Sequence, residues 1–473
     1  MSDTPSQRPR SATLQSINWI GVTCFLASVW LLRENALLPD GTLNPNRFSD
    51  VAATLIACLS FAIPIIVLEF LFRKTYRSPD AGLDWSKKLR INEASIARVA
   101  IKLVGLWTTL AIIALIYLLF PEYQATLFEP FWAVLKIAIP VFLLISPVYF
   151  FWIDGRMEEP RDGYWHLGAL MLGWSEAVDL ARLRQFGLGW LVKAFFLPLM
   201  FSYFHGNLNH LRVTEVPVFT WDMAKLDIIA WQRVLYDILI LVDVGVIVVG
   251  YTLTVRLFDS HIRSTEPTWS GWIPAIICYQ PFWGLIGPTY FSYQTEVDWA
   301  SALEGYPTLR IAFAVIILAL MGVYTWASVS FGLRFSNLTH RGIITNGPYR
   351  WCKHPAYLSK NLSWWFESLP FIAPFVFGFR GQGWSGHWSD ALGRTLRLLG
   401  VNLIYYIRAR TEERHLSDDP LYVRYAVWME SKGLMAWVPR FLRWARYAPP
   451  RWWLEERESA RIERERKDPT PGE

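Results

Sequence analysis

Charged residues are scarce in this sequence: only 18% of its 473 residues are Asp, Glu, Lys or Arg, and the net charge is +6. No long basic stripe is present that could follow a phosphate backbone, which argues against nucleic-acid binding. Cysteine is also rare. Three of the four cysteines, Cys24, Cys58 and Cys278, lie within apolar runs, so the chain is not a small secreted domain stapled by disulfides.

Several catalytic and cofactor signatures are absent as well. The sequence contains no GxSxG, GxxxxGK[ST], HExxH or paired CxxC motif, and it lacks the glycine fingerprint of soluble dinucleotide-binding domains. His205 and His210 have no neighbouring cysteine or carboxylate cluster, and His166, His261 and His387 are scattered. We therefore predict no metal site.

Apolar and aromatic residues are, in contrast, abundant. Hydrophobic residues make up 53% of the chain, and it contains 26 Trp, 20 Tyr and 29 Phe. The mean hydropathy is +0.23. Such a composition is typical of a chain with a long boundary against lipid headgroups. We therefore predict an all-α integral membrane protein.

About ten segments are long and apolar enough to cross the hydrocarbon core, which requires about 20 residues of helix. They are 17–33, 51–72, 98–120, 131–152, 186–204, 228–256, 268–291, 307–332, 362–379 and 391–409. The last two carry charges and are the weakest by hydropathy. Two further segments are not predicted to cross: 160–185 is expected along the membrane surface, and the tail 441–473 is expected to be an interfacial helix with a disordered end.

The distribution of basic residues predicts the orientation. Arg73, Lys74 and Arg77 follow the second span, whereas 121–130 contains no Lys or Arg. Because basic residues gather in cytoplasmic loops, this alternation places both termini in the cytoplasm and requires an even number of spans. We expect a multi-pass membrane protein, in the plasma or inner membrane if the source is bacterial.

Two cytoplasmic segments combine charge with aromatic residues. The first, 345–359, reads TNGPYRWCKHPAYLS and is called the His-Pro block; the second, 408–425, contains Arg410, Glu412 and Glu413 and is called the Glu-Glu block. Since Glu412 and Glu413 are adjacent, we expect only one of them to point squarely at a given site, and the other to pair with a nearby arginine.

These blocks and their spacing resemble the isoprenylcysteine carboxyl methyltransferase family and its phospholipid N-methyltransferase relatives. The resemblance covers about 310–440 and departs from the family at Lys353, where Arg is usual, and at Ser359, where Gly is common. It divides the chain into a cytoplasmic segment 1–16, a multi-span region 17–306 of unknown role, a methyltransferase-like domain 307–440 and the tail 441–473.

The resemblance implies a membrane-embedded methyltransferase that uses S-adenosylmethionine at the cytoplasmic face and acts on a lipophilic, isoprenoid or lipid-like acceptor. It assigns the cofactor to Gly347, Tyr349, Arg350, Lys353, His354, Pro355, Tyr357, Arg410, Glu412 and Glu413. For an amine or hydroxyl acceptor a general base is needed, and Glu367 and Tyr425 are the candidates.

Two other functions stay open. The first is an NADPH-dependent reductase of the sterol reductase type, although those enzymes have Asn where Ala356 stands. The second is a non-catalytic transporter or scaffold. A transporter could use Asp237 and Asp243 of the sixth span. Because these residues are six positions apart, their carboxylates lie about 120° apart around the helix and do not share one face. We expect each of them to make its own local polar contact.

Overall fold

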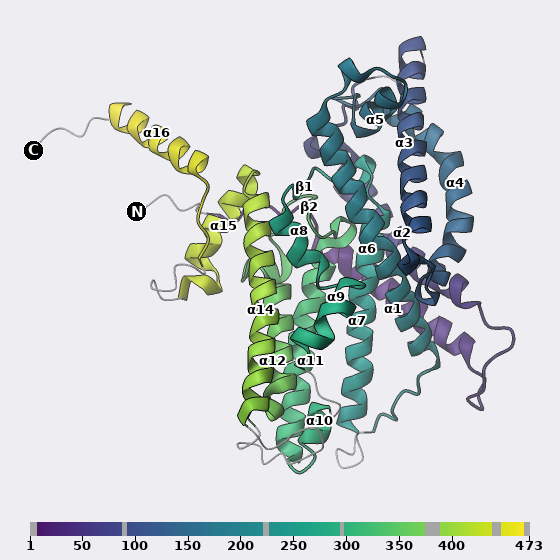
Figure 1. Ribbon diagram of the computed structural model, residues 1–473, viewed down its shortest axis with the longest axis vertical. Coiled ribbons are helices and arrows are strands. Elements are labelled where there is room, and N and C mark those ends of the chain that lie inside the picture. Colours follow the sequence, from purple (N-terminus) through teal and green to yellow (C-terminus); the bar gives the residue numbers. More distant parts are fainter. Residues whose placement is uncertain are drawn as a thin grey trace, which may run out of the picture.

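The computed structural model describes residues 7–87, 92–220, 227–293, 298–373, 388–437 and 446–467. Within these residues the chain is built almost entirely from helices, which run side by side in Figure 1. One short ribbon is found there, in which β1 (Ser264–Thr265) pairs antiparallel with β2 (Thr339–His340). The all-α fold class is therefore confirmed for the described residues.

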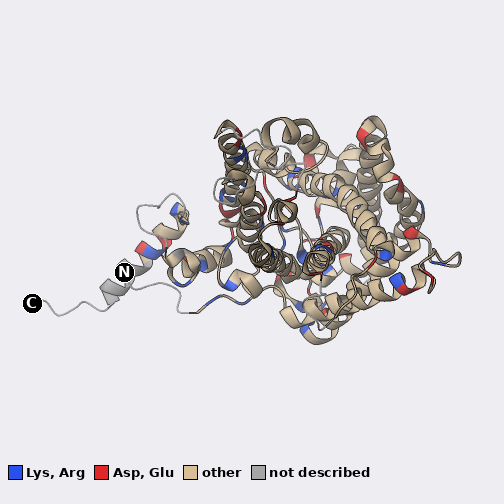
Figure 2. Cartoon of the chain, turned by 90° about the horizontal axis from the view of Figure 1, so that it is seen from below, with Lys and Arg blue, Asp and Glu red and all other residues tan. Residues whose placement is uncertain are grey.

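Seven helices of the described part are long and apolar enough to span a membrane, and each coincides in most of its length with one of the predicted spans. Figure 2, which shows the chain from below, is mostly tan, with few Lys, Arg, Asp and Glu residues among the helices. The seven are α1 (Gln15–Ala36), α2 (Asp50–Leu68), α3 (Glu93–Leu119), α4 (Glu129–Asp154), α6 (Leu180–Val213), α7 (Ile228–Thr252) and α11 (Pro307–Phe331).

The last two predicted spans are helical but are not among these seven. They fall on α12 (Pro355–Ile372) and α14 (Trp388–Leu416), and residues 374–379 lie outside the described residues. The two helices pack together through amides: Trp365 Nε1 donates to Asn402 Oδ1 at 2.8 Å, and Asn402 Nδ2 donates to Asn361 Oδ1 at 2.9 Å. Interhelical hydrogen bonds of this kind are common in helices that pack within lipid.

The prediction of one continuous helix over 268–291 is wrong. The segment consists of α8 (Trp269–Ile276), α9 (Phe282–Ile286) and a π-helical turn, Gly287–Phe291. Proline lacks the N–H of a helical hydrogen bond, and its ring clashes with the preceding turn. Hydropathy does not register this effect, so the prolines at 274, 281 and 288 were counted as ordinary members of an apolar run.

The interrupted segment nevertheless runs the length of α14. At one end Arg414 donates to Thr268 Oγ1 at 2.6 Å, and at the other Arg394 donates to the carbonyl of Tyr293 at 3.4 Å. The two arginines are 20 residues apart on α14, which corresponds to about 30 Å of helix. This length matches the thickness of a hydrocarbon core, about 30 Å.

The largest hydrophobic core joins α1, α2, α6 and α7. The Phe25 ring lies 6.3 Å from that of Phe61 and 5.9 Å from that of Phe204. Next to this core, Tyr324 of α11 donates to Asp243 of α7 at 2.8 Å, and Ser328 also donates to this carboxylate. The expectation that Asp243 makes its own local polar contact is therefore confirmed.

Two surface elements accompany the long helices. The segment 160–185 contains the short helix α5 (Gly163–Met171), which packs on α3. In the tail, α15 (Pro420–Lys432) is followed by α16 (Arg451–Lys467), while 441–445 and 468–473 lie outside the described residues. Trp453 of α16 is only 8% exposed, because it packs against the core that α15 forms.

Described residues near the beginning and in the tail of the chain contact the same end of the helices. The backbone N–H of Ala12 donates to the carbonyl of Ile343 at 2.9 Å, within the loop between α11 and α12. Near the other terminus, the hydroxyls of Tyr447 and Ser417 lie 2.7 Å apart, and Ser417 directly follows α14. Both predicted blocks lie at this same end.

Candidate functional site

The loop between α11 and α12 is held by one buried guanidinium. Arg341 donates five hydrogen bonds of 2.6–3.0 Å to backbone carbonyls and is 2% exposed. The accepting carbonyls lie near or after the C-terminal ends of α7 and α11. They belong to Gly250, Leu253, Ser260, Leu333 and Phe335. All five guanidinium donors are therefore used for structure, since arginine has five N–H groups.

The His-Pro block then turns into α12. Gly347 has φ +57°, which a residue with a side chain rarely adopts, and a Cβ placed there would lie 2.4 Å from Ser330 Oγ. Pro355 is the first residue of α12, where proline is favoured because the N–H of that position has no helical partner. The turn brings Lys353, His354 and Tyr357 to the beginning of the helix, facing the end of α14.

The Glu-Glu block faces these side chains. Glu413 accepts hydrogen bonds from Lys353 at 2.8 Å, from His354 Nε2 at 3.2 Å and from Arg410 at 2.6 Å. Glu412 accepts one from the Tyr357 hydroxyl at 3.0 Å. The structure therefore brings the two predicted blocks into direct contact.

The expectation that only one glutamate points at the site while the other pairs with an arginine is only partly correct. Glu413 does pair with an arginine, yet both carboxylates reach the His-Pro block. Glu412 lies 3.8 Å from His354 Nδ1, on the other side of the imidazole from Glu413. This is possible because His354 precedes the first turn of α12 and its ring lies between the two adjacent side chains. Glu412 is 39% exposed, whereas Glu413 is 6% exposed.

A third segment, not predicted from the sequence, completes the cluster. Lys353 also binds Glu430 of α15 at 2.9 Å, and Glu430 accepts from Arg446 and from the backbone N–H of Tyr447. The Lys353 ammonium lies 4.9 Å from the centre of the Tyr447 ring. Glu430 and Tyr447 belong to neither block, and no motif in the sequence distinguishes them from other residues of the tail.

Neighbouring groups favour the ionised form of two carboxylates in this cluster. Although burial opposes ionisation, the hydrogen bond from His354 and the ammonium of Lys353 lower the pKa of Glu413 to about 2. Burial likewise opposes the ionisation of Glu430, and the neighbouring Lys353 lowers the pKa of this carboxyl below its ordinary value. Both carboxylates are therefore ionised at neutral pH.

A small cavity of about 60 Å³ lies between the blocks and is bounded by Tyr349, Lys353, His354, Glu412 and Tyr425, among others. Four polar atoms of residues that line it are buried and have no hydrogen-bond partner among the described residues. They are Arg334 Nε, Thr339 Oγ1, His340 Nε2 and the Tyr422 hydroxyl. Because a buried polar group without a partner costs about 1–3 kcal/mol, this part of the site is suited to a polar ligand.

Other predicted site residues lie differently. Arg350 is exposed, and its guanidinium lies 4.2 Å from the centre of the Trp351 ring, not in the cluster. Tyr425 is buried, and its hydroxyl donates to the carbonyl of Tyr349 at 2.6 Å. Glu367 accepts a hydrogen bond from Ser363. Glu367 lies 13 residues beyond His354 in the sequence and hence about 20 Å further along α12. The cluster therefore does not include Glu367.

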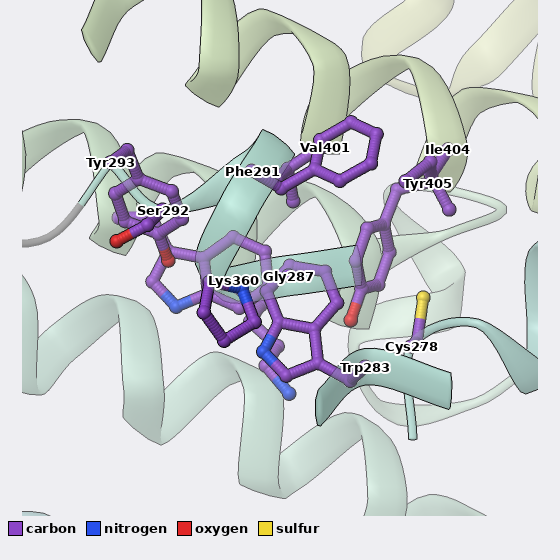
Figure 3. A pocket seen from close by; sticks show the side chains of 12 residues that line it. Cys278, Trp283, Gly287, Phe291, Ser292, Tyr293, Lys360, Val401, Ile404 and Tyr405 are labelled. Carbon is purple, nitrogen blue, oxygen red and sulfur yellow. The ribbon is translucent and has the colours of Figure 1, made fainter. Parts of the chain in front are cut away.

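A second and larger cavity, of about 350 Å³, begins one helical turn further along α12 (Figure 3). It lies between the interrupted segment, α12 and α14, and its lining includes Trp283, Phe291, Lys360, Trp364 and Tyr405. Aromatic contacts connect it to the cluster, since the Tyr405 and Tyr357 rings lie 5.4 Å apart. Sequence reasoning expected a lipophilic acceptor near Trp364 but did not identify this space.

A comparison of the chain with family models, curated proteins and solved structures finds no match. The two blocks, their spacing and their contact in the structure are thus the observations on which a function can be argued.

Proposed function

We propose that this protein is a membrane-embedded methyltransferase that uses S-adenosylmethionine and acts on a lipophilic acceptor. The observation that carries the proposal is the contact of the two blocks. His354 and Tyr357 on one side meet Glu412 and Glu413 on the other, across a loop and a helical hairpin. Because both blocks resemble those of isoprenylcysteine carboxyl methyltransferases, we interpret their contact as the cofactor site.

The donor set of the site suits the cofactor. A zwitterionic amino acid requires a carboxylate for its ammonium group, and an adenosine and a sulfonium favour aromatic faces. Glu412 is the half-exposed carboxylate of the cluster, and the rings of His354 and Tyr357 are parallel with centres 5.5 Å apart. The partnerless atoms of Thr339 and Tyr422 offer further hydrogen bonds.

Binding also requires the site to open. A cavity of about 60 Å³ has room for only a few water molecules. The half-exposed Glu412 is the member of the cluster that we expect to move most readily, since among the described residues it accepts a hydrogen bond from Tyr357 alone. Glu413 is held by three donors and is expected to stay in place.

The cofactor supplies a methyl group on a sulfonium, which is transferred by in-line displacement. The contribution of the protein is to hold the acceptor in line and to exclude water. Lys353, His354 and Glu413 fix the cofactor side, while Tyr357 and Tyr405 separate it from the larger cavity.

A carboxylate or thiolate acceptor needs no base, and neither predicted base is well placed. Burial raises the pKa of Tyr425 well above its ordinary value, so its phenol keeps its proton at neutral pH. Its hydroxyl is also engaged with the Tyr349 carbonyl. Glu367 lies too far along α12. An acceptor that is already anionic is therefore the simplest choice.

The topology that we propose has ten membrane crossings and two cytoplasmic termini. Seven crossings are the long apolar helices, and α12, α14 and the interrupted segment 268–291 supply the other three. The meeting of Ala12 with Ile343 and of Tyr447 with Ser417 at one end supports an even number. This end is then the cytoplasmic one, where the cofactor is available.

The test is the transfer of tritium from S-[methyl-³H]adenosylmethionine to an organic extract of membranes that contain the protein. We expect transfer by the wild type and by Lys193→Met, a lysine that lines neither cavity, but not by His354→Ala. A parallel thermal-shift experiment compares S-adenosylhomocysteine with NADPH. Stabilisation by NADPH alone would reject the methyltransferase in favour of a reductase.

A further inference from the structure

The larger cavity exists because a membrane-length segment is interrupted. Segment 268–291 is broken at 277–281, where Pro281 lies, and it ends in a π-helical turn that contains Pro288; this broken backbone forms one wall of the cavity. Non-helical backbone at membrane depth is tolerated where it is buried in protein or lines a cavity. In membrane proteins such Gly- and Pro-interrupted segments point to binding sites. The volume of about 350 Å³ lies within the range of small-molecule sites.

Lys360 is the cationic side chain in the lining of this cavity, as Figure 3 shows. Its ammonium lies 4.8 Å from the centre of the Tyr324 ring and 5.4 Å from that of Trp364. Among the described residues, no carboxylate lies within 4.0 Å of it. Two carboxylates, Asp243 and Glu367, act on Lys360 electrostatically from beyond ion-pair distance. Both already accept hydrogen bonds, Asp243 from Tyr324 and Ser328 and Glu367 from Ser363.

A charged group in an apolar site is costly without a partner of opposite sign. Two aromatic faces compensate part of this cost for Lys360, but they leave its three N–H donors unused. The remaining lining is largely apolar and aromatic, with Trp283, Phe291, Val401 and Ile404. The cavity thus combines a cation that makes no close ion pair among the described residues with a surface for hydrocarbon.

We propose that this cavity binds an amphiphile with a single acidic head, a carboxylate or a phosphate, whose acid contacts Lys360 and whose hydrocarbon lies against the aromatic wall. The site requires no cofactor and so goes beyond the proposed methyl transfer. If the methyl transfer is correct, the amphiphile is its acceptor, because Lys360 follows Tyr357 by one helical turn on α12.

The test measures equilibrium binding to the purified full chain, by scintillation proximity with radiolabelled oleate, in the absence of S-adenosylmethionine. Dodecyl phosphate and oleyl alcohol serve as competitors. We expect at least one of the two acids to bind about 10-fold or more tightly than the alcohol, since hydrogen bonds to charged groups contribute more than neutral ones. The better acid identifies the head as carboxylate or phosphate.

Variants of the cation and of the wall complete the design. Lys360→Met should weaken binding of the preferred acid about 10-fold or more, whereas Lys360→Arg should retain it. Lys193→Met is the matched control: this lysine also lies over an aromatic ring, 3.5 Å from the centre of Trp190, but outside the cavity. Val401→Phe fills the cavity and should weaken all three ligands.

Equal binding of acids and alcohol, or unchanged acid affinity in Lys360→Met, would overturn the proposal. If Lys360→Met does not fold, Lys360→Gln and the ligand comparison in the wild type decide the question. Binding of S-adenosylhomocysteine is measured separately, and we expect it to be unchanged in Lys360→Met. Failure of the cofactor to bind thus counts against the methyltransferase alone, and failure of the acids counts against this site alone.

Discussion

Replacing Glu413 by glutamine should destabilise the protein in a pH-dependent way. This carboxylate accepts hydrogen bonds from Lys353, His354 and Arg410 and is 6% exposed. Its pKa is lowered from 4.5 to about 2 in the folded protein. With about 1.4 kcal/mol for each unit of pKa, ionised Glu413 contributes roughly 3 kcal/mol to folding at neutral pH.

The sign of the pH dependence follows from the lowered pKa. The contribution is complete above the unfolded pKa of about 4.5 and is lost as the pH falls toward the folded value of about 2. Glutamine does not titrate. The difference in unfolding free energy between wild type and Glu413→Gln should therefore be largest at pH 6–7 and fall by about half or more at pH 3.

The assay is thermal unfolding of the detergent-purified proteins at one scan rate, at pH 7, 5 and 3. Glu412→Gln is the matched control, because Glu412 is 39% exposed and the effect of its charge on stability is expected to be small. An equal shift of the midpoint at all three pH values for Glu413→Gln would refute the reasoning, as would a larger shift for Glu412→Gln.

Three further substitutions probe the same end of the molecule. Tyr357→Phe removes the hydroxyl that donates to Glu412, and it should raise the dissociation constant for S-adenosylhomocysteine about 2- to 10-fold in calorimetric titration. Arg341→Met leaves five backbone carbonyls without their donor; we expect a loss of more than about 3 kcal/mol and a lower unfolding midpoint, with no such loss contradicting its structural role. Gly347→Ala meets Ser330 Oγ and a φ of +57°, and should cost about 1–3 kcal/mol in the same assay; a neutral result would show that the turn relaxes.

The sequence predicts much of the fold because hydropathy is a property of composition and length. It correctly located the seven long apolar helices. It failed at 268–291, since an apolar run does not reveal how its prolines divide the backbone. The cavity that results from this division was consequently not foreseen.

The site was predictable only as far as its residues are close in sequence. The His-Pro and Glu-Glu blocks each form a recognisable pattern, and the structure brings them together. Glu430 and Tyr447 join the cluster through tertiary contacts alone, and no local pattern indicates them. The orientation of Arg350 toward Trp351, away from the cluster, likewise depends on the packing around the turn.

The most direct test of the central claim is calorimetric titration of the purified wild type with S-adenosylhomocysteine, repeated with Glu412→Gln and with Lys193→Met. We predict one binding site per chain. Glu412→Gln should raise the dissociation constant about 10-fold or more, since hydrogen bonds to charged groups contribute about 1.5–3 kcal/mol. Lys193→Met should leave the dissociation constant unchanged. A wild type that does not bind this ligand, or a Glu412→Gln variant that binds it equally well, would contradict the account.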